Sequence, residues 1–101
     1  MKRRFPDDER YQLSSQLRRA AYSVVANIVE GMSRQSPKEK LHFLNIAEGS
    51  LAEAGYCLHA AHRLGYLTEA ERQALVEKSK MVGGPLIGLV HSLQRDVAGG
   101  G

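Results

Sequence analysis

The sequence predicts an all-α fold, an antiparallel up-and-down bundle with three long helices. Apolar residues recur every three or four positions over three long segments, and no segment shows the strict alternation of a strand. With 43% hydrophobic residues, the chain is too apolar to be disordered. Its 101 residues predict one domain over 1–101, with an N-terminal arm at 1–6 and a disordered tail at 99–101.

The first predicted helix follows Pro6 and ends near Gly31 or Ser33. Asp7 can cap its first turn, where negative charge also complements the helix dipole. Val25 and Val29 widen an apolar face that consists of Leu13, Leu17, Ala20, Ala21, Val24 and Ile28. Such wide apolar faces leave surface uncovered, so we expect a fourth helix, from another copy or missing from this chain, to complete the packing.

The second predicted helix begins with a capping box, in which Ser36 is the N-cap, Pro37 is the first helical residue and Glu39 lies three after the cap. It ends at Gly65, a natural C-terminal glycine after Leu64. One face carries Phe43, Leu44, Ala47, Ser50, Leu51, Ala54, Leu58 and Ala61.

The third predicted helix begins with a second capping box, formed by Thr68 and Glu71. Its apolar spacing continues across Gly83-Gly84-Pro85, which predicts one kinked helix, with two separate helices as the alternative. The residues that keep this spacing are Leu75, Val82, Leu86, Leu89 or Val90, Leu93 and Val97.

A polar seam accompanies the apolar faces of the first two helices. Ser and Asn in mid-helix positions are poor helix formers, which is unusual for a face that only meets water. We therefore expect the seam to pack against a second helix or subunit, although a solvated face is the simpler alternative. The seam consists of Gln16, Arg19, Ser23, Asn27, Glu30, Arg34, Gly49 and Glu53.

Two features of the seam suggest specific contacts. Gly49 is costly inside a helix, and close approach of another backbone is the usual compensation. Arg19 or Arg34 paired with Glu30 or Glu53 would form an ion network that fixes register and partner choice. An acid and base pair of Glu30 and Glu53 is a weaker alternative, because it would also need a cleft and a shifted pKa.

The net charge of +3 is concentrated in residues 1–40, which hold nine Lys or Arg against five Asp or Glu. Arg3, Arg4, Arg10 and Arg18 are candidate contacts to nucleic-acid phosphates. Asp7, Asp8 and Glu9 interrupt this basic run, so a solvated chain end is the competing interpretation.

Other function classes receive no support from the sequence. Cys57 is the single cysteine, and it shares no helix face with both His59 and His62, so we expect no metal site and no cofactor. No apolar run is long enough to span a membrane, and the N-terminus lacks the apolar core of a signal peptide. We therefore expect a cytoplasmic protein without membrane contact.

The chain resembles the four-helix-bundle proteins encoded in intervening sequences of bacterial 23S ribosomal RNA genes. The resemblance covers about residues 5–67 and rests on Phe5-Pro6, Glu9, Tyr11, Leu13, Gln16, Arg18-Arg19-Ala20, Ser23, Asn27, Glu30-Gly31, Arg34, Phe43, Ala47, Gly49-Ser50 and Glu53. It implies a bacterial cytosolic protein that associates with copies of itself, as a five-membered ring. No catalytic activity is established for the family, so the resemblance implies no enzyme.

The sequence departs from the family pattern in two respects, and one of them is the Gly83-Gly84-Pro85 break, which is unlike the smooth last helix expected of the family. The family carries a further helix before the Phe-Pro turn, whereas four residues precede Phe5 here. We thus expect a non-enzymatic, self-associating protein of the four-helix-bundle type with its first family helix apparently missing. The alternative is an RNA- or nucleoprotein-binding accessory factor, similar in fold to the bundles that assist reverse transcriptases.

Overall fold

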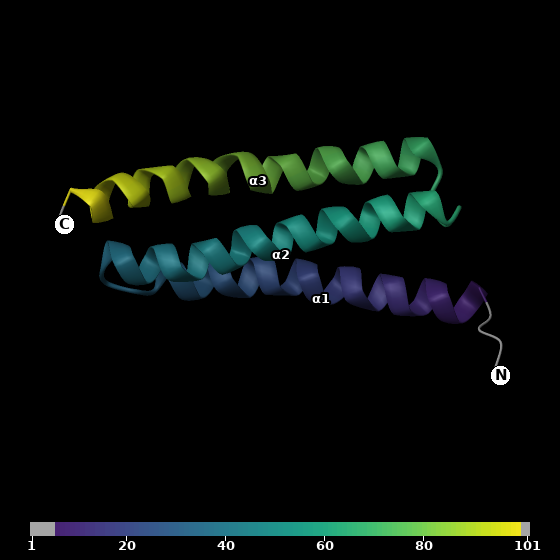
Figure 1. Ribbon diagram of the computed structural model, residues 1–101, viewed down its shortest axis with the longest axis horizontal. Coiled ribbons are helices and arrows are strands. Elements are labelled where there is room, and N and C mark those ends of the chain that lie inside the picture. Colours follow the sequence, from purple (N-terminus) through teal and green to yellow (C-terminus); the bar gives the residue numbers. More distant parts are fainter. Residues whose placement is uncertain (1–5, 100–101) are drawn as a thin grey trace.

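Three long helices make up the protein. The computed structural model describes the backbone of residues 6–99 and the side chains of residues 8–99. In chain order the helices are α1 (Pro6–Met32), α2 (Pro37–Arg63) and α3 (Glu69–Ala98), and the links between them are four and five residues long (Figure 1). The described backbone contains no strand, which confirms the all-α prediction.

Helix α2 lies between the other two. Both α1 and α3 pack on it, whereas no described Cα atom of α1 lies within 8 Å of one in α3 (Figure 1). The molecule is therefore elongated and thin, with principal extents of 56 × 31 × 18 Å. One side of α2, flanked by α1 and α3, is left without a covering helix.

The contact between α1 and α2 is close because small residues form it. Ala20 on α1 and Ala54 on α2 are buried there, and Ser23 is hydrogen bonded to the buried Ser50. Near the end of α1, a methyl group placed on Gly31 would lie only 3.2 Å from Phe43 Cβ. These short side chains bring the two helix backbones near to each other.

The contact between α2 and α3 contains the main apolar core. Leu44 is fully buried, and Val90 is almost so. Gly83 also lies against this contact, since a Cβ added to it would stand 3.0 Å from Leu51 Cδ2. The buried cluster consists of Leu44, Ala47, Leu86, Val90 and Leu93, with Ile28, Leu41, Leu51 and Leu89 packed around it.

The ends of α1 and α2 agree with the sequence in part. Helix α1 begins at Pro6, so Asp7 lies inside the helix and not before it, which corrects the predicted cap. Ser36 caps α2, because its hydroxyl oxygen accepts a hydrogen bond from the Glu39 N–H. In a full capping box the Glu39 carboxylate would accept from the Ser36 N–H, but here it accepts from the Ser36 hydroxyl. Gly65 follows α2 at a φ of 82°, as expected of a C-terminal glycine.

Helix α3 shows a complete capping box and runs through its glycine and proline residues. Thr68 accepts a hydrogen bond from the Glu71 N–H, and the Glu71 carboxylate accepts one from the Thr68 N–H. The helix continues across Pro85 without interruption, so the alternative of two separate helices is wrong. Gly99 is its C-cap. The predicted tail therefore reduces to residues 100–101, which lie outside the described residues, as do 1–5 of the predicted arm.

Candidate functional site

The inner part of the polar seam joins two helices of the same chain. Ser23 Oγ and Ser50 Oγ are 2.8 Å apart across the contact between α1 and α2. Asn27 donates from Nδ2 to Ser23 Oγ at 3.1 Å and to the Ser23 carbonyl at 2.8 Å. These polar groups are part-buried, and their hydrogen bonds are made within the chain. This part of the seam therefore joins α1 to α2 of the same molecule.

The outer part of the seam lines an open polar cleft of about 540 Å³ between α1 and α2. Arg19 stands on the α1 side and Glu53 on the α2 side, and both side chains are exposed. Neither makes a hydrogen bond or an ion pair with any other residue whose side chain is described. The cleft, which we call the polar cleft, is lined by Gln16, Arg19, Ala20, Ser23, Ser50, Glu53, Tyr56 and Cys57.

Cys57 lies at the base of the polar cleft and is buried. Its burial raises the pKa of the thiol above 9.0, and the nearby negative charge of Glu53 raises the pKa further. A thiolate is the nucleophilic form of cysteine, and these surroundings disfavour it. The thiol is therefore suited to packing at neutral pH.

Arg34 belongs to a separate corner beyond the end of α1. Its guanidinium pairs with Glu30 at 3.1 Å and lies 3.8 Å from Glu39, and it stands over the Phe43 ring at 4.8 Å. Of the pairs expected between the seam arginines and acids, Arg34 with Glu30 is the one that forms among the described residues. Arg34 thus fastens the link to the start of α2, away from Arg19.

The two seam acids do not meet. Glu30 is next to Gly31, which contacts Phe43, whereas Glu53 is ten residues further along α2. At 1.5 Å per residue this separates the two carboxylates by roughly 15 Å along the helix. The alternative of an acid and base pair made from Glu30 and Glu53 therefore has no geometric basis within one chain.

Gly49 occupies an exposed position on the seam side of α2. Nothing among the described residues lies within 4 Å of the place that a Cβ would take. The close backbone approach expected at this glycine therefore does not occur within the described chain. The close approaches are at Gly31 and Gly83, which the sequence pattern did not single out for this role.

The four arginines predicted as phosphate contacts are not gathered into one described cluster. Arg3 and Arg4 lie outside the described residues. The Arg10 guanidinium lies 5.0 Å from the centre of the Tyr66 ring, and the Tyr66 hydroxyl donates to Glu9 at 3.1 Å. Arg18 is exposed on α1.

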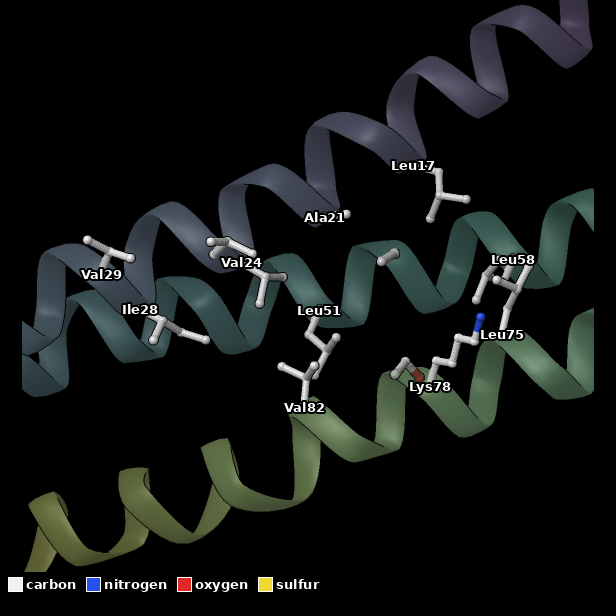
Figure 2. Close-up of a pocket in the computed structure, with 13 residues that line it drawn as sticks. Leu17, Ala21, Val24, Ile28, Val29, Leu51, Leu58, Leu75, Lys78 and Val82 are labelled. Atoms are coloured by element: carbon white, nitrogen blue, oxygen red, sulfur yellow. The ribbon is translucent and has the colours of Figure 1, made fainter.

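An apolar groove lies on the open side of α2, between α1 and α3. Its volume is about 550 Å³. Figure 2 shows Leu51 of α2 and Val82 of α3 pointing toward one another, while Leu17 and Ala21 line the α1 side. The lining residues are Leu17, Ala21, Val24, Val25, Ile28, Val29, Leu51, Ala54, Leu58, Leu75, Lys78, Ser79 and Val82. The wide apolar face that Val25 and Val29 give α1 was the signal for it in the sequence.

The histidines considered as metal ligands have other surroundings. His62 Nε2 lies 3.3 Å from Glu69, which also holds Arg72 in a two-fold hydrogen bond. Within residues 8–99, no group of three or more His, Cys, Asp or Glu side chains is placed to hold a metal ion. Across the described helices, no segment is both long and apolar enough to cross a membrane.

The two outer helices both pack on α2, and the described residues define a small all-α protein with a polar cleft and an apolar groove on its surface. Residues 1–88 match the model of the 23S rRNA-intervening sequence protein family, and the chain belongs to that family. This match confirms the resemblance found in the sequence.

A solved structure supports the same assignment. The chain is similar to the crystal structure of a protein of unknown function from the S23 ribosomal protein family of Bacteroides thetaiotaomicron, with 29% identity. The similarity covers 77% of this chain and 72% of that chain, at a TM-score of 0.73. No curated protein shows a significant match.

Proposed function

We propose that this protein is a non-enzymatic, self-associating component of the bacterial cytoplasm, in which copies pack as antiparallel helical bundles. The observation that carries the proposal is the polar cleft, which presents an arginine and a glutamate without partners among the side chains of residues 8–99. Arg19 of one copy and Glu53 of the next are complementary charges, so each copy would supply what the other lacks.

This arrangement favours a closed assembly. A contact in which one copy offers Arg19 and the next offers Glu53, with no reciprocal pair, is head-to-tail. Head-to-tail contacts close into rings when the rotation between copies permits. The five-membered ring implied by the family resemblance is an assembly of this type, and ion pairs at its contacts would set register more than stability.

The chemistry around the cleft also favours a binding role over catalysis. A catalytic acid or base needs a pKa matched to its task, and a nucleophile needs activation. The raised pKa of the Cys57 thiol works against nucleophilic attack at neutral pH. We therefore propose packing and recognition as the role of this surface.

The test is the solution mass by light scattering during size-exclusion chromatography. We expect an oligomer for the natural sequence, and smaller species for Arg19→Glu and for Glu53→Arg, because each change sets like charges against each other. The double variant Arg19→Glu with Glu53→Arg should recover the oligomer, since the pair is restored in reverse. A monomer at every concentration, or an oligomer indifferent to both charge reversals, would contradict the proposal.

Gly49 provides a matched pair of variants for the same surface. Gly49 and Gly55 are both exposed on α2, and at neither would an added Cβ lie within 4 Å of another described part of the chain beyond the local helix. Within one chain, Gly49→Ala and Gly55→Ala should therefore stabilise the helix alike, by about 0.5–1 kcal/mol. If a second copy approaches the seam at Gly49, Gly49→Ala alone should weaken association.

A second candidate is an accessory protein that binds RNA or a nucleoprotein. The observation in its favour is Arg18, which is exposed on α1. Phosphate contacts lose affinity steeply as salt rises. Filter binding of a single-stranded RNA at increasing salt tests this role: Arg18→Ala should weaken binding and reduce the salt slope, and no retention at low salt would exclude it.

A further inference from the structure

We propose that two copies of this chain join through the apolar groove, each laying α1 into the groove of the other. The proposal rests on the self-association proposed above and assigns to it a second surface, distinct from the polar cleft. The part of α1 that would enter the partner's groove is an exposed stripe, which we call the α1 stripe and which consists of Tyr22, Val25, Val29 and Met32.

The α1 stripe has the spacing of a helix that inserts into a groove. Its members stand at i, i+3, i+7 and i+10, so they share one side of the helix, and such anchors are typical of helix-in-groove recognition. Their exposed fractions are 77%, 61%, 64% and 51%. Apolar side chains at this spacing, open to solvent over more than half their surface, indicate a face that another molecule covers.

The composition of this part of α1 supports the same conclusion. Residues 20–29 include no charged residue, although one quarter of the chain is charged. Among the described residues α1 packs on α2 alone, yet its composition is that of a helix covered on two sides.

The groove and the α1 stripe also agree in length. Along α1 the groove extends from Leu17 to Val29, and the α1 stripe extends from Tyr22 to Met32. At 1.5 Å per residue these segments measure roughly 18 Å and 15 Å. A single helix can therefore cover the floor of the groove, where Leu51 and Val82 lie (Figure 2).

The position of the stripe identifies the partner as a second copy. Val25 and Val29 belong to the α1 stripe, and both also line the groove. A two-fold contact between identical chains requires one patch that is complementary to itself. The groove meets this condition, because the valines that form part of its wall are also the side chains that would enter the partner's groove. The two α1 helices would then lie side by side, and each would bury the other's valines.

Helix α3 is less suited to this role. Its exposed Met81 and Ile87 are six residues apart, which places them roughly 120° apart around the helix. They therefore form no single stripe. Lys78, the one charged side chain that lines the groove, is long enough to keep its ammonium group in water while its methylenes cover apolar surface.

The valines of the α1 stripe lie away from the polar cleft, whereas Tyr22 stands one helical turn from Arg19. Val25 and Arg19 are six residues apart, so they point roughly 120° away from each other around α1. One chain can accordingly use its α1 stripe for one copy and Arg19 for another. The two contacts are thus separable by mutation.

Val25→Glu, with Ala26→Glu as its matched control, tests the groove contact. Both residues are exposed neighbours on α1, and Ala26 points about 100° away from Val25, outside the groove. Circular dichroism checks that both variants remain helical. We expect Val25→Glu to halve the mass seen by light scattering and Ala26→Glu to change it much less, because Ala26 lies beside Tyr22 but does not line the groove.

Cysteine variants in a Cys57→Ala background give a second readout. A two-fold contact brings a position near its centre next to the same position of the partner, within the distance that a disulfide spans. Mild oxidation of Tyr22→Cys, Val25→Cys or Val29→Cys should give a covalent dimer from at least one variant, in clearly higher yield than Ala26→Cys, whose position does not line the groove.

The outcomes separate the two proposals. A natural protein that is monomeric at all concentrations overturns both and leaves the groove to a helix of different origin. An oligomer that survives Val25→Glu and yields no specific crosslink overturns the groove contact alone. An oligomer that loses half its mass with Val25→Glu, and crosslinks through the α1 stripe, supports it whether or not the charge reversals at Arg19 and Glu53 have an effect.

Discussion

Ser23 Oγ lies 2.8 Å from Ser50 Oγ across the contact between α1 and α2, and Asn27 donates to the same Ser23 oxygen. Ser50 is buried, so its hydroxyl depends on this bond. Polar groups that are paired inside a helix contact favour one register, because sliding either helix by a turn would leave them without partners.

Ser23→Ala should destabilise the fold by about 1–3 kcal/mol, because it leaves the buried Ser50 hydroxyl without its partner. Ser23→Ala with Ser50→Ala should cost less than the sum of the single changes, since neither hydroxyl is then left alone. Urea unfolding measures these free energies. Ser14→Ala is the control, because Ser14 bonds the Tyr11 carbonyl at an exposed site of the same helix, and its effect should be small.

Two glutamates at the start of α3 should make the free energy of unfolding fall at acid pH. Hydrogen bonding from Thr68 lowers the pKa of Glu71 below its ordinary 4.5, and hydrogen bonding from Arg72, followed by the charges of Arg72 and His62, lowers the pKa of Glu69. A carboxyl with a lowered pKa stabilises the fold above 4.5, and this contribution is lost as the pH falls through the lowered value.

Glu71→Gln should therefore flatten the decline of stability below pH 4.5, because glutamine keeps an acceptor oxygen for the Thr68 N–H but does not titrate. The midpoint of urea unfolding, followed from neutral to acid pH, measures the effect. Glu77→Gln is a suitable control, since the Lys80 ammonium lies 3.9 Å from the exposed Glu77. If the urea midpoint falls with pH equally steeply in Glu71→Gln and in the natural sequence, the prediction is wrong.

The thiol of Cys57 should report the charge of Glu53. Burial is the main cause of its raised pKa, and the Glu53 carboxylate adds to it. Glu53→Gln should lower the pKa of the Cys57 thiol toward 9.0 without reaching it, because the burial remains. The ultraviolet absorbance of the thiolate, followed against pH, gives this titration, and an unchanged curve would place Glu53 too far from the thiol to act.

Leu44 should be the most sensitive position of the core. It lies on α2 and is fully buried in the core cluster, so Leu44→Ala removes apolar contacts on all sides and should cost about 2–5 kcal/mol. Ile46→Ala, at a position two residues away that is 41% exposed, should cost much less. Denaturant unfolding of the two variants makes the comparison.

The helices and most of their ends followed from the sequence, because spacing and capping are local properties. Thr68 with Glu71, and Gly65 after α2, needed no tertiary information. The apolar spacing through Pro85 likewise predicted one helix. With Asp7 as the cap, the predicted helix starts two residues after Pro6, which is within the usual uncertainty of a helix end.

The arrangement of the seam could not be read from spacing. Arg19 and Ser23 belong to the same polar seam on α1. In the structure Ser23 bonds to Ser50 of α2, whereas Arg19 faces the polar cleft, because α2 covers only part of the seam. The roles of Gly31 and Gly83 depend on Phe43 and Leu51, which are distant in sequence. Such pairs are set by tertiary packing, which periodicity does not encode.

The central place of α2 also determines how the fold comes apart. Because α1 and α3 are joined only through α2 among the described residues, either outer helix can detach while the other pair stays folded. The molecule then behaves as two helical hairpins that have α2 in common, and it unfolds locally, one hairpin at a time, before it unfolds globally. Backbone amides in the middle of α2 should exchange with deuterium most slowly, since they are exposed only when both hairpins have opened.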